Sequence, residues 1–351
     1  IKDQVFQYCS SLQSVIISDG ISSIMTQTFE YCESLQSIVI PKSVTIIEDF
    51  AFYRCSSLKS IIIPENITSI GSRAFFNCSN LEKVSYLGII EPFYKGLIFN
   101  FTKVEMILVP EMYKSATFCD VITIKSSGNC GPNLKFNFES ENLFITGEGL
   151  MNNFTEDSLP IWYNYRKFIE SINISEGVTS IGSYAFELCA NLKSIRIPQT
   201  ISFIESYAFY KCSNLESIII LSNVTSIGNS AFFNCSNLET VIYAGISNPL
   251  GGDSIFNGTK VEAILVSEEY NINTFCGFIA AKPSGECGSK LKFNIETGNL
   301  NITGEGPMYN YEYSSPPIWY YYRKFIESIN ICEGVTHIGH YSFFQLSKIE
   351  T

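Results

Sequence analysis

The sequence predicts a repeat solenoid, a right-handed coil with a parallel β-sheet, and three observations support this fold class. One cysteine recurs every 23 residues, at Cys9, Cys32, Cys55 and Cys78, and again at Cys189, Cys212 and Cys235. A set of apolar positions recurs with this cysteine in each unit. A longer repeat lies above the first, because 161–178 returns as 318–335 with 16 of 18 residues identical. Such nested periods are typical of proteins built from stacked coils.

The first half of each 23-residue coil is a predicted strand. In LKSIIIP, residues 58–64, β-branched residues favour a strand and a proline ends it. Alternation places Ile61 and Ile63 inside the coil, and Ser60 and Ile62 outside it. Stacked coils would align these strands into one parallel sheet on the concave side of the solenoid.

The second half of each coil predicts a short helical or 3₁₀ segment on the convex side. Residues 69–81, SIGSRAFFNCSNL, carry apolar residues at steps of three to five. Phe75 is expected to point inward, where stacking would bury equivalent rings as a ladder. The pattern fails at 87–103, LGIIEPFYKGLIFNFTK, which lacks the Ala-Phe-x-x-Cys core. The convex side of that coil is therefore left open.

Two copies of a second module interrupt the coils. The gaps between coil starts from 104 to 169 and from 261 to 326 are one coil plus 42 further residues. Each module contains two strand-like stretches around a polar turn, 134–149 and 291–306, which predict β-hairpins. The predicted order is a first repeat array, a module, a second array, a second module and the start of a third array: 1–110, 111–165, 166–267, 268–322 and 323–351.

Composition favours a folded protein and excludes two classes of partner. Of 351 residues, 46% are hydrophobic and 16% are charged, which suits a chain with a large core. The formal net charge of −11 opposes binding to nucleic acid or to an anionic membrane surface. There is no apolar run of about 18 residues, so no membrane insertion is expected within this segment. Because both ends fall inside a repeat, we expect the chain to be a fragment of a longer protein.

The repeat unit resembles that of a known family. Residues 178–198, VTSIGSYAFELCANLKSIRIP, are similar to the BspA-type (treponemal-class) leucine-rich repeat, and the resemblance covers essentially the whole chain. The passage 143–182 resembles a module that often precedes such repeats in bacterial and protozoan surface proteins. The resemblance implies a leucine-rich-repeat fold and an extracellular or cell-surface protein used in adhesion to host proteins or other cells. It supplies no catalytic residue.

The twelve cysteines fall into two groups. Seven share the repeat position, and a buried column of thiols is favoured there over metal or redox chemistry, since no CxxC pair or His cluster accompanies them. Cys119/Cys130 and Cys276/Cys287 lie off this column at one spacing, which predicts two local disulfides. Each would contribute up to about 3 kcal/mol and would need an oxidising compartment. Cys332 has no evident partner.

Other candidate chemistry is weak. His337 and His340 have no repeated counterparts, and phosphate-binding loops and repeated calcium motifs are missing from the sequence. Two repeated aromatic clusters are expected to seal the junction between module and solenoid rather than to stack on a sugar. They are Trp162, Tyr163 and Tyr165, and Trp319, Tyr320 and Tyr322. We therefore expect no catalytic residue, no metal and no cofactor. Nine N-x-S/T sequons occur, of which Asn77 and Asn234 precede a buried cysteine and are poor acceptors. The remainder fit a secreted glycoprotein: Asn66, Asn100, Asn153, Asn173, Asn223, Asn257 and Asn301.

The concave sheet is the predicted ligand-binding surface. Its outward positions form a column of hydroxyl residues beside a column of mostly aliphatic ones. An exposed aliphatic strip indicates a contact surface, whereas the alternative is that β-propensity alone chose these residues. The predicted binding residues are Ser37, Val39, Ser60, Ile62, Ser85, Ser194, Arg196, Ser217, Ile219, Thr240 and Ile242. The columns are expected to continue outward at Met106, Leu108, Ala263 and Leu265.

One rim of the sheet is expected to be acidic, which would favour a basic partner or keep the array soluble. The residue after the strand start is glutamate at Glu82, Glu105, Glu170, Glu216, Glu239, Glu262, Glu327 and Glu350. Two functions remain open. The first is adhesion or recognition through a protein ligand, such as a host or extracellular-matrix protein. The second is a structural spacer that presents other domains of a longer surface protein.

Overall fold

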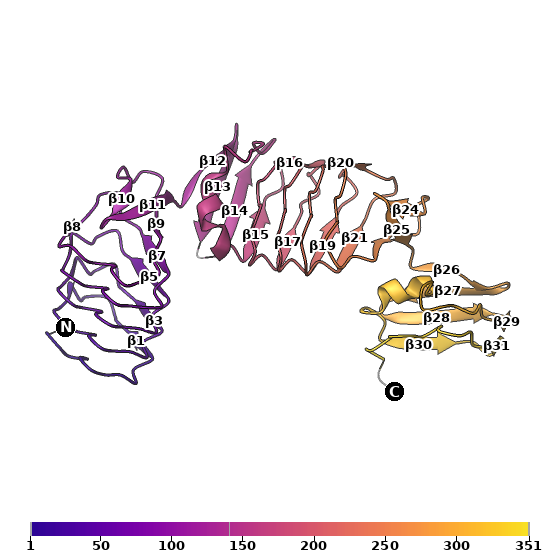
Figure 1. The fold of residues 1–351 in the computed structure, drawn as a ribbon, viewed down its shortest axis with the longest axis horizontal. Helices are drawn as coiled ribbons and strands as arrows, with labels where there is room; N and C mark the ends of the chain where they lie inside the picture. The colour runs from indigo at the N-terminus through magenta and orange to yellow at the C-terminus, as the bar shows by residue number, and fades with distance from the viewer. Residues whose placement is uncertain (1, 140, 350–351) are drawn as a thin grey trace. The chain divides into compact units, whose positions relative to one another are not determined.

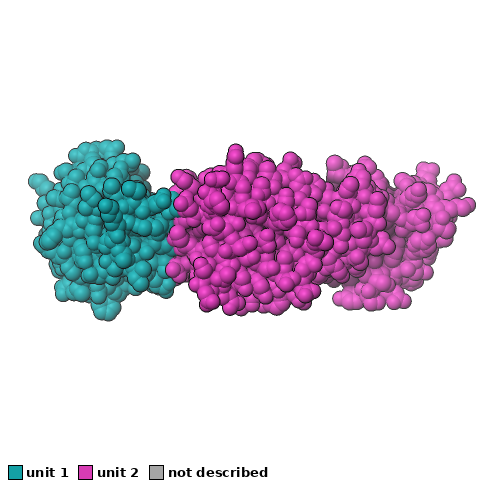
Figure 2. Space-filling model, turned by 90° about the horizontal axis from the view of Figure 1, so that it is seen from above, with its two compact units in different colours: residues 1–128 teal, residues 129–351 magenta. Residues whose placement is uncertain are grey.

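The computed structural model describes residues 2–139 and 141–349, which form two compact units, 1–128 and 129–351 (Figure 2). Each unit is built from stacked 23-residue coils, as predicted. The described residues contain two 3₁₀ helices, η1 (Ile161–Phe168) and η2 (Ile318–Tyr322). In this part of the chain no helix has both the length and the apolar character that crossing a bilayer requires.

In unit 1, each coil contributes one strand to a main sheet (Figure 1). Neighbouring 23-residue coils pair their strands in parallel with a 23-residue shift, as in the pairs Ser60↔Lys83 and Ile62↔Ser85. The hydrogen-bond ladder is interrupted between the second and third of these strands, which remain in contact. Beyond the last coil, Val121–Lys125 joins the sheet in parallel and Thr117–Phe118 pairs with it antiparallel. The strands are β1 (Ser14–Ile16), β3 (Ser37–Val39), β5 (Ser60–Ile63), β7 (Lys83–Tyr86), β9 (Met106–Val109), β11 (Val121–Lys125) and β10 (Thr117–Phe118).

The second half of each coil is not helical, so the helical or 3₁₀ prediction for 69–81 is wrong. It consists of a two-residue strand followed by turns, because Arg73 and Asn77 are left-handed, with φ of 56° and 58°. A left-handed residue cannot continue a right-handed helix. Alternate backbone donors bond the next coil instead, as when Phe52 N–H donates to the Ala74 carbonyl at 2.8 Å. The short strands form their own parallel ladder: β2 (Ser23–Ile24), β4 (Ile46–Ile47), β6 (Ser69–Ile70) and β8 (Phe93–Tyr94).

Ladders of equivalent side chains fill the interior. Phe29, Phe52, Phe75 and Phe99 stack in sequence, with ring centroids 5.0–5.5 Å apart. Phe99 completes the ladder in the coil whose convex side the sequence left open, and Thr102 stands there in place of the cysteine. Burial of each phenyl ring contributes about 2–3 kcal/mol, which a coil obtains only by stacking on its neighbours.

Unit 2 begins with the predicted hairpin, which is confirmed. Its second strand also pairs in parallel with the first coil strand, as in Asn142↔Ser171, so the hairpin starts the sheet of the next array. The strands of this sheet are β12 (Ser127–Gly131), β13 (Leu134–Glu139), β14 (Asn142–Gly147), β15 (Ser171–Ile174) and β17 (Ser194–Arg196). The main sheet then continues with β19 (Ser217–Ile220), β21 (Thr240–Tyr243), β23 (Ala263–Val266), β25 (Phe278–Ala281) and β24 (Thr274–Phe275).

The second module repeats this arrangement within unit 2. Its hairpin is also confirmed, and its second strand pairs with the first strand of the third array, as in Asn299↔Ser328. The strands are β26 (Ser284–Gly288), β27 (Leu291–Glu296), β28 (Asn299–Gly304), β30 (Ser328–Ile331), β29 (Gly306–Pro307) and β31 (Val335–His337). The short ladder of unit 2 comprises β16 (Ser180–Ile181), β18 (Phe203–Ile204), β20 (Ser226–Ile227) and β22 (Leu250–Gly251).

The predicted module 111–165 is divided between the two units. Strands β10 and β11 extend the main sheet of unit 1, whereas β13 and β14 belong to the first sheet of unit 2. The unit boundary falls after Gly128, inside the module. The five segment boundaries drawn from the repeat lengths stay a prediction.

Candidate recognition surface

The open face of each main sheet, defined as the side that points away from the core, carries the predicted binding residues. Alternation along β5 buries Ile61 and Ile63 and exposes Ser60 and Ile62, as the sequence predicted. The exposed members of the predicted set are Ser37, Val39, Ser60, Ile62, Ser194, Arg196, Ser217 and Ile219. The half-buried members are Ser85, Thr240 and Ile242.

In unit 1 the aliphatic column forms an exposed strip. Ile16, Val39 and Ile62 lie on successive coils and are 95%, 75% and 53% exposed. Strand register places Ile16 directly beside Val39. Exposure ends at the last coil, where Met106 is half-buried and Leu108 is buried, so the outward prediction fails there. These three side chains are the part of the predicted contact surface of unit 1 that is most open to solvent.

In unit 2 the last coil is covered, which corrects a second outward prediction. Ala263 and Leu265 are each 6% exposed, because they pack in one cluster with Trp319 and Tyr322 of the second module. The Tyr322 hydroxyl also donates to the Ala281 carbonyl at 2.8 Å. Strand alternation alone cannot show this, since the covering residues lie more than 50 positions further along the chain. The pairs Ser217↔Thr240 and Ile219↔Ile242 remain beside the covered coil.

An apolar groove borders this covered coil. Its volume is about 470 Å³, and its lining includes Ile242, Leu265, Pro283, Tyr322 and Phe325. Phe325 is 42% exposed, although it lies against the predicted face. The groove therefore joins Ile242, predicted from strand alternation, to Tyr322, which the sequence placed in a junction-sealing aromatic cluster. Pro283 and Phe325 also line it, and the sequence did not single them out. The recurrence of the segment 161–168 at 318–325 was a sign in the sequence that these residues matter. It did not show which residues the segment contacts.

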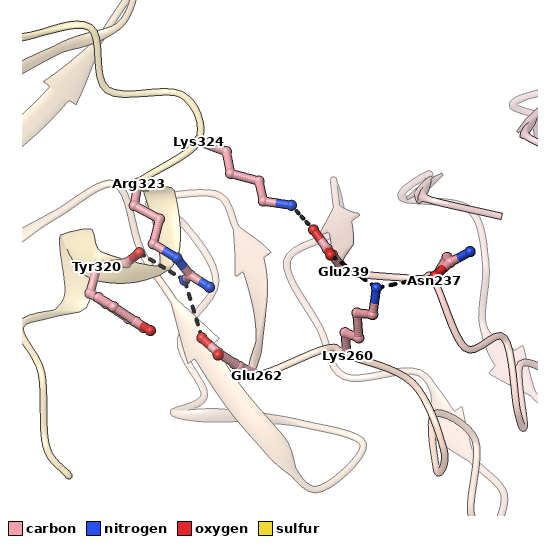
Figure 3. Close-up of polar contacts among 7 residues, drawn as sticks. All are labelled: Asn237, Glu239, Lys260, Glu262, Tyr320, Arg323 and Lys324. Atoms are coloured by element: carbon pink, nitrogen blue, oxygen red, sulfur yellow. Dashed lines mark hydrogen bonds and ion pairs between the residues drawn. The ribbon is translucent and has the colours of Figure 1, made fainter. Parts of the chain in front are cut away.

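Charged pairs hold the module beside the rim of the sheet (Figure 3). Arg323 Nη1 lies 3.1 Å from Glu262 Oε2, and Lys324 Nζ pairs with Glu239 Oε2. Lys260 Nζ lies 3.5 Å from the other oxygen of Glu239. Exposed pairs of this kind contribute about 0.2–1 kcal/mol each, so they orient the module more than they stabilise it.

The predicted acidic rim is therefore partly neutralised in unit 2. Glu170 is also within 3.9 Å of Lys193 Nζ. Glu350 lies outside the described residues. A basic partner would consequently meet a rim whose charge is lower than the glutamate count suggests.

The family model of the BspA-type leucine-rich repeat region matches residues 1–121, 161–277 and 317–351 of the sequence, in six copies. The chain belongs to this family. A comparison with curated proteins found no match.

Solved structures provide further similar proteins. A leucine-rich repeat protein from Bacteroides ovatus is 19% identical, with a TM-score of 0.28 over 99% of this chain and 62% of that one. A leucine-rich cell surface protein from Faecalibacterium prausnitzii is 23% identical, with a TM-score of 0.29 over 75% and 62%. The pneumococcal vaccine antigen PcpA is 19% identical, with a TM-score of 0.30 over 74% and 70%. The chain spans about 62% of the length of the first two.

The aromatic clusters of this BspA-type chain seal the modules, as predicted. Trp162 is buried, and its Nε1–H donates to the Ala185 carbonyl at 2.6 Å. Its ring packs edge-on against Phe136 of the hairpin, with centroids 5.0 Å apart. Trp319 repeats both contacts, to Ser342 and to a hairpin phenylalanine. Rings enclosed in this way have no free face on which a sugar could stack.

The repeated cysteines form the expected thiol column. Cys55 Sγ–H donates to the Phe29 carbonyl at 3.2 Å. Cys32, Cys78, Cys212 and Cys235 repeat this bond between coils. Burial raises the pKa of Cys32 to about 11, so its thiol stays protonated at neutral pH. Cys9, in the first coil, is exposed and departs from the prediction.

The two predicted disulfides are absent, so this prediction is wrong. Cys119, Cys130, Cys276 and Cys287 are all free. Cys119 packs in the core of unit 1 at the turn between β10 and β11, whereas Cys130 lies in β12, a strand of a different sheet. Equal spacing in sequence therefore reflected the repeat rather than proximity. Burial raises the pKa of Cys130 to about 12 and that of Cys276 to about 11.

The described residues contain no cluster of side chains that could form a metal centre. Across residues 2–139 and 141–349, no three His, Cys, Asp or Glu side chains gather closely enough to hold an ion. What the surface offers chemically is apolar contact, hydroxyl groups and a rim of paired charges.

Proposed function

We propose that this BspA-type chain is a non-catalytic recognition protein, secreted or displayed at a cell surface, which binds a protein partner through the open face of its main sheet. The observation that carries the proposal is the strip Ile16, Val39 and Ile62, whose three side chains are more than half exposed on successive coils. Repeats of this family generally mediate contacts between proteins. The partner is a host or extracellular-matrix protein, or a protein of another cell.

The chemistry of the strip sets the kind of binding. Equivalent side chains recur about every 5 Å along parallel strands, which makes a surface too long for a small substrate. Covering it would contribute about 25 cal/mol for each Å² of apolar surface removed from water. Since Ile62 and its neighbours carry no charge, affinity through the strip should change little with ionic strength. Secretion would expose the sequons other than Asn77 and Asn234 to glycosylation. A glycan on Asn173, which lies on the open face, would then restrict access to that face.

A spacer is the second candidate, and one observation favours it. The open face of unit 2 ends beneath the second module, so Leu265 serves the packing of the chain rather than a ligand. An array that covers the end of its own sheet with a module would suit spacing of other domains.

Four variants test the proposal. Ile62→Lys and Ile219→Lys place a charge on the open face of units 1 and 2. Their controls, Phe93→Lys and Leu250→Lys, place the same charge at exposed apolar positions on the short ladder of the same unit. Binding of the full chain to a panel of immobilised extracellular-matrix proteins is measured on a biosensor. Ile62→Lys should weaken binding by at least about tenfold, because burying an unpaired charge is costly.

Thermal unfolding shows whether each variant is folded. If both open-face variants fold and bind like the parent chain, the open face is not the site and the spacer function is favoured. Loss of binding in the controls alone would move the site to the short ladder.

A further inference from the structure

A column of aromatic side chains runs along the turns of unit 1, outside the core. Ring centroids are 4.9 Å apart for Tyr8 and Tyr31, 5.6 Å for Tyr31 and Tyr53, 5.6 Å for Tyr53 and Phe76, and 5.0 Å for Phe76 and Phe101. Tyr8 and Phe101 are exposed, and the three rings between them are half-buried. These five residues are called the aromatic column.

Two arginines lie on this column. The Arg54 guanidinium is 5.3 Å from the centroid of Tyr31 and 5.9 Å from that of Tyr53. The Arg73 guanidinium is 5.6 Å from the centroid of Phe76. Stacking holds a guanidinium by its face and leaves its in-plane N–H groups free to form a bidentate contact. Both arginines are exposed, and the ion pairs found within the described ranges include neither of them.

The repeat itself does not require this arrangement. At the positions of unit 2 that correspond to Tyr31, Arg54, Arg73 and Phe101, the chain has Leu188, Lys211, Ser230 and Gly258. Those coils keep the same buried phenylalanine ladder. Unit 1 also has 10 basic against 12 acidic residues, compared with 13 against 22 in the rest of the chain. Unit 2 keeps only the middle pair, as Tyr210 and Phe233 with Lys211 over Tyr210. The full column with two arginines is therefore a feature of the less acidic unit.

We propose that the aromatic column, with Arg54 and Arg73, binds an acidic peptide segment of a partner protein. Carboxylates of the peptide accept hydrogen bonds from the two guanidiniums, and its apolar side chains cover the ring edges. A polyanion of high charge density is disfavoured, because a chain of net charge −11 repels it at long range. A segment with a few carboxylates between apolar residues satisfies both parts of the surface. The column lies on the turns rather than on the open face, so this site is independent of the proposed function.

Fluorescence anisotropy with the full chain tests the site. The probe is an end-capped, fluorescein-labelled octapeptide that alternates glutamate with tyrosine and leucine, compared with the same peptide carrying lysine for glutamate. The glutamate peptide should bind, and the lysine peptide should not. Arg54→Gln/Arg73→Gln should weaken binding by at least about tenfold, since hydrogen bonds to charged groups are lost. The control Lys59→Gln/Lys114→Gln removes two exposed positive charges of the same unit and should bind like the parent chain.

A second variant keeps the test decisive if the glutamine pair fails to fold. Arg54→Lys/Arg73→Lys preserves charge but loses the planar fork, so it should also lose most of the binding. Equal losses in the arginine and control pairs would show non-specific attraction and overturn the site. Tighter binding of heparin than of the glutamate peptide would overturn the peptide as ligand. Ile62→Lys should leave peptide binding intact, which separates this site from the open face.

Discussion

The two units have equivalent cores and differ in which surface residues they leave exposed. Phe52 and Phe75 stack at 5.0 Å in unit 1, and their counterparts Phe209 and Phe232 stack at 5.1 Å in unit 2. On the open face, however, the strip of unit 1 is exposed over successive coils, whereas the last coil of unit 2 packs beneath Trp319 and its neighbours. The 23-residue pattern therefore determines the packing of the interior. Residues outside the pattern determine which part of the surface stays exposed.

Because the two cores are equivalent, equivalent truncations should lower the free energy of unfolding equally in the two units. Phe75→Ala and Phe232→Ala each remove a buried ring held between two others at 5.0–5.5 Å. Each should lower the free energy of unfolding of its own unit by about 3–5 kcal/mol. Urea unfolding, followed by fluorescence and by limited proteolysis of each unit, provides the measurement.

The control is Phe93→Ala, which removes an exposed ring of unit 1 and should change stability by less than about 0.5 kcal/mol. The two rings have equivalent neighbours, so the two buried truncations should lower the free energy of unfolding by similar amounts. A difference of more than about 2 kcal/mol between them would contradict the equivalence of the cores.

A smaller effect should distinguish the units at alkaline pH. Burial, with Cys119 and Glu91 nearby, raises the pKa of Tyr86 from 10.0 to about 12. Burial also raises the pKa of its counterpart Tyr243, but Asn248 stands where unit 1 has the Glu91 carboxylate. Since the folded pKa of Tyr86 exceeds its unfolded one, this phenol stabilises the fold fully below about pH 10 and loses that contribution as pH rises towards about 12. The pKa of Tyr243 is shifted in the same direction.

Replacement by phenylalanine removes this ionisation. Tyr86→Phe should therefore flatten the fall in Tm between about pH 9 and pH 12 more than Tyr243→Phe does. Thermal unfolding at intervals of one pH unit gives the two profiles. A steeper profile for Tyr86→Phe than for the parent chain would contradict the assignment.

Much of the fold could be predicted from residue periodicity. Alternation around Ile61 and Ile63 placed the strand faces, and the polar turns placed both hairpins. The helical prediction failed because steps of three to five apolar residues also arise from consecutive turns. Arg73 gave no sign of its left-handed backbone, because arginine is not enriched in that region. Asn77 gave only a weak one, because asparagine is enriched there but is not confined to it.

The candidate surface was predictable to the extent that it follows strand alternation. Ile62 and Ile219 are exposed for that reason. The covering of Leu265 could not be predicted, because it depends on how a distant segment folds back onto the sheet. The equal spacing of Cys119 and Cys130 misled for a related reason: distance along the chain does not state which sheet each residue joins.

The most direct test of the open face as the binding site is site-specific photo-crosslinking. p-Benzoylphenylalanine replaces Val39, on the exposed strip, or Phe93, on the short ladder of the same unit, and each chain is irradiated with the matrix protein that binds the parent chain on the biosensor. The recognition account predicts a crosslinked complex from position 39 and none from position 93. Crosslinking from position 93 alone would contradict it.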